Sequence, residues 1–367
     1  MFHRRGYHQV SMADVAAEVG ITAPALYRHF RGKSELLFQV LDLELSAVRG
    51  AVRGGLDGPA GLCASLATAA IDHRALGTLW QRDARRLPAA QRAGLRHGLR
   101  ASVQEMAGVV AASRPELSCA DAELLSWSVL SVYGSLSYHT FTPPRRRFER
   151  LLRGIGADVL ALSPTALPGG ESAGPAVQLG CRVPESRREA LLTAAVRLFD
   201  ERGFDNVSTD QLGAAVGIAG PSVYKHFDTK SELLAAALVR SRERLWHEVE
   251  GAIRAAAAPA DALAAGLRAY VDFARRNRHY LGAMLSETER LAEPERKAAL
   301  DFRRDFLRTW VGLLQQVRPE YDNAEARIRV HAMFALVNDG VRGAPGSRRP
   351  DLADCLVALG WAVLGLG

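Results

Sequence analysis

The feature that most constrains this chain is an internal repeat. Residues 5–37 align without a gap on residues 202–234, and 17 of the 33 aligned positions are identical. Shorter matches follow in approximate register: residues 86–87 with 290–291, and residues 114–116 with 318–320. A repeat of this length indicates that a whole structural unit has been duplicated. We therefore expect two similar units in tandem.

The composition fits a folded helical protein. The 367 residues are 48% hydrophobic and 24% charged, which is typical of globular chains, and the length allows two or three domains. Apolar residues recur at helical spacing, as in the segments 191–199 and 302–314, and clear period-two alternation is missing. We therefore predict an all-α fold.

Several classes of protein are disfavoured by what the sequence lacks. The four cysteines form no C-x-x-C pair, so no metal site is expected. No motif of a known enzyme class appears, so we expect neither enzymatic activity nor a cofactor. No apolar run reaches the roughly 18 residues of a membrane span, and the first residues do not resemble a signal peptide. We expect a cytoplasmic protein with no membrane partner.

Each copy reads as short helices separated by a glycine turn. In the second copy, a first helix is predicted over residues 186–202, with Gly203 as its cap. Ser208 and Gln211 then form a capping box that opens the next helix. Gly217 ends that helix, because glycine takes the positive φ that a sharp turn requires. The corresponding residues of the first copy are Ser11, Asp14 and Gly20.

A short third helix follows, with one apolar side and one polar side, as in a helix-turn-helix recognition helix. Val223 and Phe227 are spaced to pack inward, as are Leu26 and Phe30 in the first copy. Thr229 and Glu232 predict another capping box, which opens a fourth helix. The net charge of +7 favours a polyanionic partner, and double-stranded DNA is the expected one. The candidate DNA-contacting residues of this pattern are Thr22, Ala25, Arg28, His29, Ser222, Lys225 and His226, and Lys230 is placed to reach a phosphate.

Both copies resemble the DNA-binding head of the TetR/AcrR family of bacterial repressors. The shared pattern is glycine, an apolar residue, two small residues, Tyr-x-His-Phe and then Lys-x-Glu-Leu-Leu, within residues 4–41 and 187–238. The resemblance implies that four residues hold DNA backbone phosphates while the exposed face of the third helix reads bases in the major groove. The four are Tyr27, Lys33, Tyr224 and Lys230. The resemblance also implies that the affinity for DNA falls steeply as the salt concentration rises.

The first copy departs from the family pattern at its start. Met1 and Phe2 align on Leu198 and Phe199, which lie near the end of the first helix of the second copy. A head without that helix is expected to be under-packed. We expect in-frame helical coding sequence upstream of Met1.

The resemblance assigns the rest of each copy to a helical ligand-sensing and dimerising domain. Each half ends in two long apolar helices, predicted over residues 123–139, 146–162, 324–341 and 352–364. Because one chain supplies both pairs, we predict an internal pseudo-dimer built on a four-helix contact. Its operator should be asymmetric, since Arg28 and Lys225 are not equivalent at bidentate sites. The alternative is a homodimer in which only the second head reads DNA and the first is degenerate.

An effector pocket is expected in the helical domains. Large side chains at helical spacing are candidates to line it, although most such residues simply pack. The candidates are Trp80, Trp127, Tyr133, Tyr270, Tyr280, Met284 and Trp310. By family analogy, we expect a repressor that a small, largely apolar molecule releases from DNA.

These predictions divide the chain into five parts. The segment from residue 163 to residue 180 contains three prolines and four glycines, a composition that propagates neither helix nor strand. The predicted parts are a head at 1–44, a helical regulatory domain at 45–163, a linker at 164–182, a second head at 183–238 and a second regulatory domain at 239–367.

Overall fold

The computed structural model describes residues 1–7, 9–162, 186–343 and 349–366. Every regular element in these ranges is helical, which confirms the all-α prediction. The predicted linker at 164–182 lies outside the described residues. The chain forms two compact units: unit 1 contains the described residues of 1–163, 318–352 and 356–367, and unit 2 those of 164–317 and 353–355.

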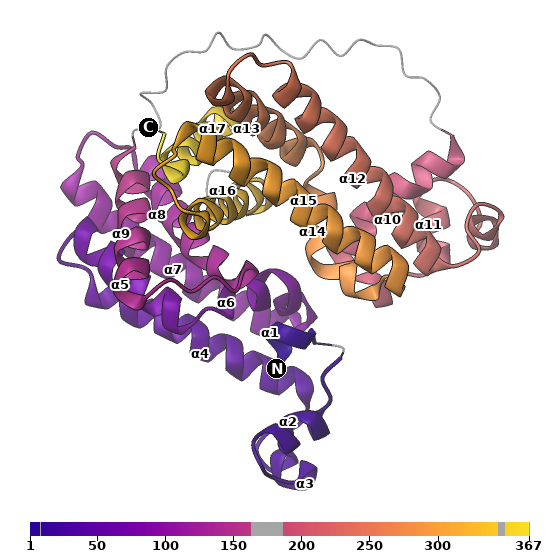
Figure 1. The fold of residues 1–367 in the computed structure, drawn as a ribbon. Helices are drawn as coiled ribbons and strands as arrows, with labels where there is room; N and C mark the ends of the chain where they lie inside the picture. Colours follow the sequence, from indigo (N-terminus) through magenta and orange to yellow (C-terminus); the bar gives the residue numbers. More distant parts are fainter. Residues whose placement is uncertain (8, 163–185, 344–348, 367) are drawn as a thin grey trace. The chain divides into compact units, whose positions relative to one another are not determined.

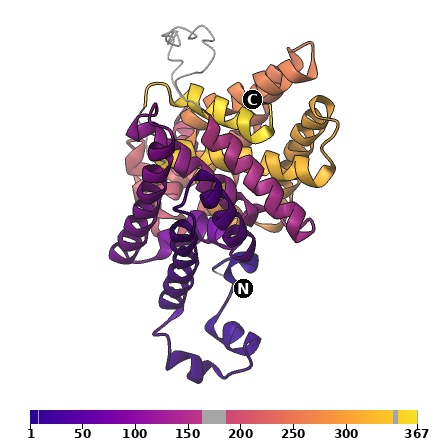
Figure 2. The ribbon, with the colours of Figure 1, turned by 90° about the vertical axis from the view of Figure 1, so that its left-hand side faces the viewer.

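The first copy supplies most of unit 1. Its first three helices are short, and the fourth, of 22 residues, continues from the head into the helical domain, so the predicted boundary at residue 44 falls inside a helix. Figures 1 and 2 show α2 and α3 projecting beyond one end of α4. The helices are α1 (Phe2–Arg5), α2 (Met12–Glu18), α3 (Ala23–Tyr27), α4 (Lys33–Gly54), α5 (Pro59–Asp72), α6 (Leu76–Thr78), α7 (Ala89–Ser113), α8 (Cys119–Gly134) and α9 (Arg145–Ala161).

The core of the first helical domain lies between α4, α5, α7, α8 and α9, which pack in pairs. Leu62 and Phe148 are fully buried there. Tyr133 of α8 donates its hydroxyl to the carbonyls of Cys63 and Leu152, at 3.3 and 3.2 Å. This side chain therefore ties α8 to both α5 and α9.

The second copy forms unit 2 up to its last two helices. Here α12 packs along α13, and α10 contacts α11, α12 and α14. Ser186 caps α10 by accepting the N–H of Glu189 at 3.2 Å, and Gly203 ends it with a φ of 81°, as predicted. The helices are α10 (Arg187–Arg202), α11 (Thr209–Ala215), α12 (Lys230–Arg254), α13 (Pro259–Arg276), α14 (Arg278–Glu287) and α15 (Glu293–Val317).

The capping predictions are confirmed at two positions and half wrong at a third. Ser11 with Asp14 and Ser208 with Gln211 both form reciprocal capping boxes. At the start of α12, Thr229 accepts the N–H of Glu232 at 3.0 Å. The Glu232 carboxylate instead accepts the N–H of Asp228, one residue before the cap, at 2.6 Å. Thr229 and Glu232 therefore do not form a reciprocal capping box, because the Glu232 carboxylate bonds to the residue before the cap.

The last two helices of the second copy pack into unit 1. These are α16 (Asn323–Gly343) and α17 (Leu352–Leu364), of which all but residues 353–355 belong to that unit. Helix α16 lies on α8 of the first copy, as Figure 1 shows. Arg329 donates to the carbonyl of Val363 at 2.9 Å, which joins α16 to α17. The second copy thus completes the helical domain of the first.

Candidate functional site

Each head is built on a glycine turn between two short helices. Gly20 and Gly217 have φ of 71° and 73°, a backbone conformation that favours glycine. The N–H of the isoleucine after each glycine donates to a carbonyl of the preceding helix, at 2.9 Å in the first head and 3.0 Å in the second. Because the two turns have the same geometry, they launch the following element in the same way.

The element after each turn presents one side to the core. In the first head it is α3, and in the second it is a 3₁₀ helix, η5 (Gly220–Lys225), so its type differs between the copies. Leu26, Val223 and Phe227 are buried, while Phe30 is half-buried against the small core of the first head. The inward packing predicted for these residues is confirmed.

The opposite side of each element faces solvent. Tyr27 is 54% exposed and Tyr224 is 52% exposed, which is unusual for such large rings. Thr22 accepts the N–H of Ala25 at 3.4 Å and so caps α3. The other predicted residues divide into exposed ones, Thr22, Arg28, His29 and Lys225, and half-buried ones, Ala25, Ser222 and His226. The structure therefore leaves a tyrosine hydroxyl and a cation of each head exposed to solvent.

The two lysines predicted to hold phosphates are engaged within their own heads. The ammonium of Lys230 donates to the carbonyls of Phe204 and Val207, at 2.8 and 3.0 Å, and lies 4.3 Å from the centre of the Phe204 ring. Lys33 lies 4.2 Å from the centre of the Tyr7 ring. Burial lowers the pKa of both lysines. Each lysine thus ties the start of its long helix to the segment before α2 in the first head and before α11 in the second.

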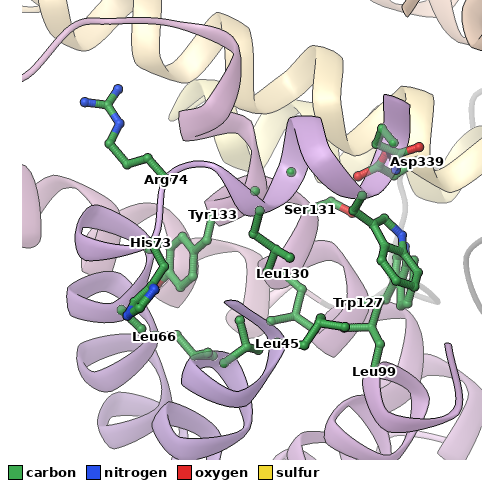
Figure 3. A pocket seen from close by; sticks show the side chains of 18 of the residues that line it. Leu45, Leu66, His73, Arg74, Leu99, Trp127, Leu130, Ser131, Tyr133 and Asp339 are labelled. Carbon is green, nitrogen blue, oxygen red and sulfur yellow. Dashed lines mark hydrogen bonds between the residues drawn. The ribbon is translucent and has the colours of Figure 1, made fainter. Parts of the chain in front are cut away.

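A cavity opens in the helical domain of unit 1 (Figure 3). The cavity volume is about 90 Å³. Because one water molecule needs roughly 10–15 Å³, several waters fit inside. Three of the predicted pocket residues line it: Trp80, Trp127 and Tyr133. Leucines 45, 66, 76, 99 and 130 supply much of the remaining wall. Its mostly apolar lining is that of a small-molecule site.

A family model for bacterial regulatory proteins of the tetR family matches the chain twice, at residues 1–40 and 191–237. These two matches cover the two heads. The chain belongs to the TetR family. This is a family of DNA-binding transcription regulators, and its members are not enzymes.

Individual TetR-family relatives resemble parts of the chain. The transcriptional activator FasR of Mycolicibacterium smegmatis is 35% identical over 95 residues, 26% of this chain and 43% of FasR. The nucleoid occlusion factor SlmA of Haemophilus ducreyi is 27% identical over 104 residues, 28% of this chain and 52% of SlmA. The chain thus spans about half the length of the curated relatives that it matches.

Solved TetR-family structures align with about half of this chain. The ketosteroid regulator KstR2 of Mycobacterium tuberculosis is 25% identical, with a TM-score of 0.43, and the alignment covers 49% of this chain and 94% of KstR2. A regulator from Bordetella parapertussis is 22% identical, with a TM-score of 0.44, and the alignment covers 48% of this chain and 94% of that protein.

The helical domain of the second TetR-type copy contains a cluster of packed aromatic rings. Trp310 is fully buried, and the Tyr270 and Phe306 rings lie 6.2 and 6.1 Å from it. Tyr280 and Met284 line a small space between α12, α14 and α15. Of the four pocket candidates in this half, Tyr270 and Trp310 therefore pack with other aromatic rings.

The contact between the two copies within unit 1 is both aromatic and charged. The His139 and His331 rings lie 5.0 Å apart, and Arg147 pairs with Asp322 at 2.7 Å. Arg349 also pairs with Asp121, a buried carboxylate. These contacts join the α8–α9 region of the first copy to residues 322–349 of the second.

One polar residue of the cavity was missed by the sequence analysis. Asp339, on α16, is the only acidic residue among those lining the cavity. Gln81 donates to it at 2.6 Å. Burial raises its pKa to about 6, although Ser131, Arg342 and Gln81 favour the ionised form. Its signal in the sequence is an acid within the apolar run from Met333 to Val341, but only the fold shows that this acid meets the first copy.

The described residues place two further limits on the site. None of their helices has the length and apolar character needed to cross a membrane. Their histidine, cysteine, aspartate and glutamate side chains form no group of three that suits a metal ion.

Proposed function

We propose that this TetR-family protein binds a specific operator with both heads of a single chain. The support is that each head exposes a tyrosine and the cation next to it in sequence, Tyr27 with Arg28 and Tyr224 with Lys225. Hydroxyls and cations position a protein on phosphates, and a cation can also read a guanine edge. Because arginine and lysine differ in geometry, the two halves of the operator differ in sequence.

The observation that carries the single-chain proposal is the packing of α16 on α8. In the family resemblance, these helices correspond to the pair that joins two subunits. Here one chain supplies both partners, and Arg147 and Arg349 of the two copies add ion pairs to the contact. An internal contact of this kind removes the need for a second subunit.

We further propose that a small molecule in the unit 1 cavity controls DNA binding. Trp80 and Gln81, which line the cavity, lie on the π-helix η1 (Leu79–Asp83). The next residue, Arg82, is buried and donates to the carbonyl of Phe2 at 2.7 Å. Arg86 lies 5.5 Å from the centre of the Tyr7 ring. A ligand that moves η1 would therefore shift the segment that holds Phe2 and Tyr7, at the start of the first head. We expect such a ligand to release the protein from DNA.

Selection of DNA from a random library tests the two-headed proposal. We expect one enriched site with two different half-sites, about one helical turn apart. If the heads together make about six phosphate contacts, affinity falls roughly 10³-fold between about 50 and 200 mM salt. A palindromic optimum contradicts the asymmetric operator, and the absence of any selected sequence contradicts specific DNA binding.

A second candidate is a homodimer that reads DNA with the second head alone. The observation in its favour is that Val19 and Ile21 of the first head are 60% and 41% exposed. Their counterparts in the second head, Val216 and Ile218, are half-buried. The double variant Tyr27→Ala with Arg28→Ala distinguishes the two: wild-type affinity supports the homodimer, and a loss comparable to that of Tyr224→Ala with Lys225→Ala supports the two-headed chain.

A further inference from the structure

The cavity of unit 1 has one polar end. Figure 3 shows Ser131, Trp127 and Asp339 together at this end, with His73 and Arg74 at the other. Ser131 hydrogen-bonds to Asp339, and Gln81 donates to its Oδ1 at 2.6 Å. Gln81 in turn accepts from Arg342 at 3.0 Å. The carboxylate is thus held in one orientation, and Asp339, which is half-buried, lines the cavity.

The cations at the other end are already engaged. Arg74 donates to Thr142 at 2.7 Å and to the carbonyl of His139 at 2.8 Å. Further bonds run to the carbonyls of Leu136 and Phe141, at 3.2 Å each. The guanidinium points away from the cavity in Figure 3, so Arg74 lines it with its aliphatic stem. His73 lies 3.6 Å from the Glu44 carboxylate.

Two indole rings also line the cavity. Trp80 and Trp127 both line the cavity, and the Trp127 indole N–H is buried without a hydrogen-bond partner. Indole faces attract cations within about 6 Å of the ring centre. A carboxylate in a mostly apolar wall that also holds two tryptophans therefore favours a cation over a neutral or anionic group.

We propose that the unit 1 cavity binds a small apolar molecule carrying a protonated amine, with the ammonium held by Asp339 between Trp80 and Trp127. The ligand then contacts both copies, because Asp339 lies on α16 and the rest of the wall belongs to the first copy. The second copy contributes an acid that the first lacks: in the register of residues 114–116 and 318–320, Ser135 corresponds to Asp339. The amine is thus the effector class for the proposed regulator, and in that role this inference rests on the proposed function.

Binding of matched ligands to the full chain in the absence of DNA tests the inference. The probes are primary amines from butylamine through phenethylamine to tryptamine, each with the alcohol and the carboxylate of the same skeleton, titrated by calorimetry at about pH 7.5. We expect at least one amine to bind at least about tenfold more tightly than its alcohol, and its carboxylate to bind most weakly. Carboxylates that bind best, or no amine binding below about 1 mM, overturn the proposal.

Variants assign the preference to the cavity. Asp339→Asn should abolish the advantage of the amine over the alcohol, whereas Asp339→Glu should keep much of it. Asp158→Asn, on the exposed side of α9, removes the same charge and should change nothing. Trp127→Leu should weaken the amine more than the alcohol, and it provides a second test if Asp339→Asn does not fold. An unchanged ratio in both folded variants overturns the assignment.

The proposed DNA-binding function and the proposed amine ligand can be refuted independently of each other. Ligand binding is measured without DNA, and operator selection without ligand. Absence of selected DNA with intact amine binding removes only the proposed regulator. Selected DNA without amine binding removes only this ligand class.

Discussion

The two heads share a sequence pattern but not a packing environment. In the second head, α10 contacts α11 and α12, and Phe227 is 2% exposed beneath them, with Arg188 4.7 Å from its ring centre. In the first head, the corresponding Phe30 is only half-buried, against a core of Met12, Ala16 and Leu26. Local sequence therefore specifies the turn and the exposed side of the element after it, whereas neighbouring helices determine how firmly both are held.

The two helical domains differ in the same manner. The first encloses a cavity walled by Trp80 and Trp127, and the second fills its interior with Trp310 and the rings around it. The two copies thus place their free space differently: in the second copy it lies between α10, α12 and α14, where Arg197, Ser241 and Tyr280 help to line it.

The largest expected effect contrasts the tryptophans of the two helical domains. Trp310→Ala should lower the free energy of unfolding by about 4–5 kcal/mol, because a fully buried ring leaves a large void. Trp127→Ala should cost clearly less, since that ring already borders a cavity. Urea unfolding followed by circular dichroism measures both. Equal losses would show that the two domains are packed alike.

The next contrast concerns the phenylalanines of the heads. Phe227→Ala should cost about 3–4 kcal/mol, and Phe30→Ala about 1–2 kcal/mol, because only the first of these rings is fully enclosed. Hydrogen exchange of α11 and α2 reports each head separately. A larger loss at Phe30 contradicts the difference in packing described here.

The acid on α16 should add a distinct pH dependence to the stability of the chain. Burial raises the pKa of Asp339 from 3.8 to about 6, so the folded chain binds more protons than the unfolded chain between these values. Its contribution to stability therefore falls as pH rises through this window, by about 2–3 kcal/mol in all. The groups facing it are Gln81, Ser131 and Arg342.

The measurement for Asp339 is the difference in unfolding free energy between wild type and Asp339→Asn at pH 4.5, 5.5 and 7. As pH rises, the unfolding free energy of the wild type should fall relative to that of Asp339→Asn. Asp158→Asn serves as the charge-matched control. A difference that is constant or grows in favour of wild type contradicts the raised pKa.

The smallest effects should come from the exposed tyrosines. Tyr27→Phe and Tyr224→Phe each remove one hydroxyl, and each should weaken operator binding by about 1–2 kcal/mol, roughly 5- to 30-fold, if that hydroxyl contacts a phosphate. Folding stability should hardly change, because both rings are about half exposed. Fluorescence anisotropy on the selected DNA measures the loss. An effect confined to Tyr224→Phe supports a first head that does not read DNA.

The local features of the fold were predictable from sequence, and the non-local ones were not. The capping boxes and the turns at Gly20 and Gly217 follow from residues three or four apart. The attachment of Lys230 to the carbonyls of Phe204 and Val207 depends on how a loop folds back. The meeting of Asp339 with Gln81 spans more than 250 residues, and no periodicity along one helix reports it.

The central claim is that one chain carries a complete pair of reading heads, and the mass of the protein–DNA complex tests it most directly. Light scattering should be measured on the free protein and on its complex with the selected operator. The account predicts one chain of 39.7 kDa in solution and one chain per operator. Two chains on a single palindromic site would contradict it.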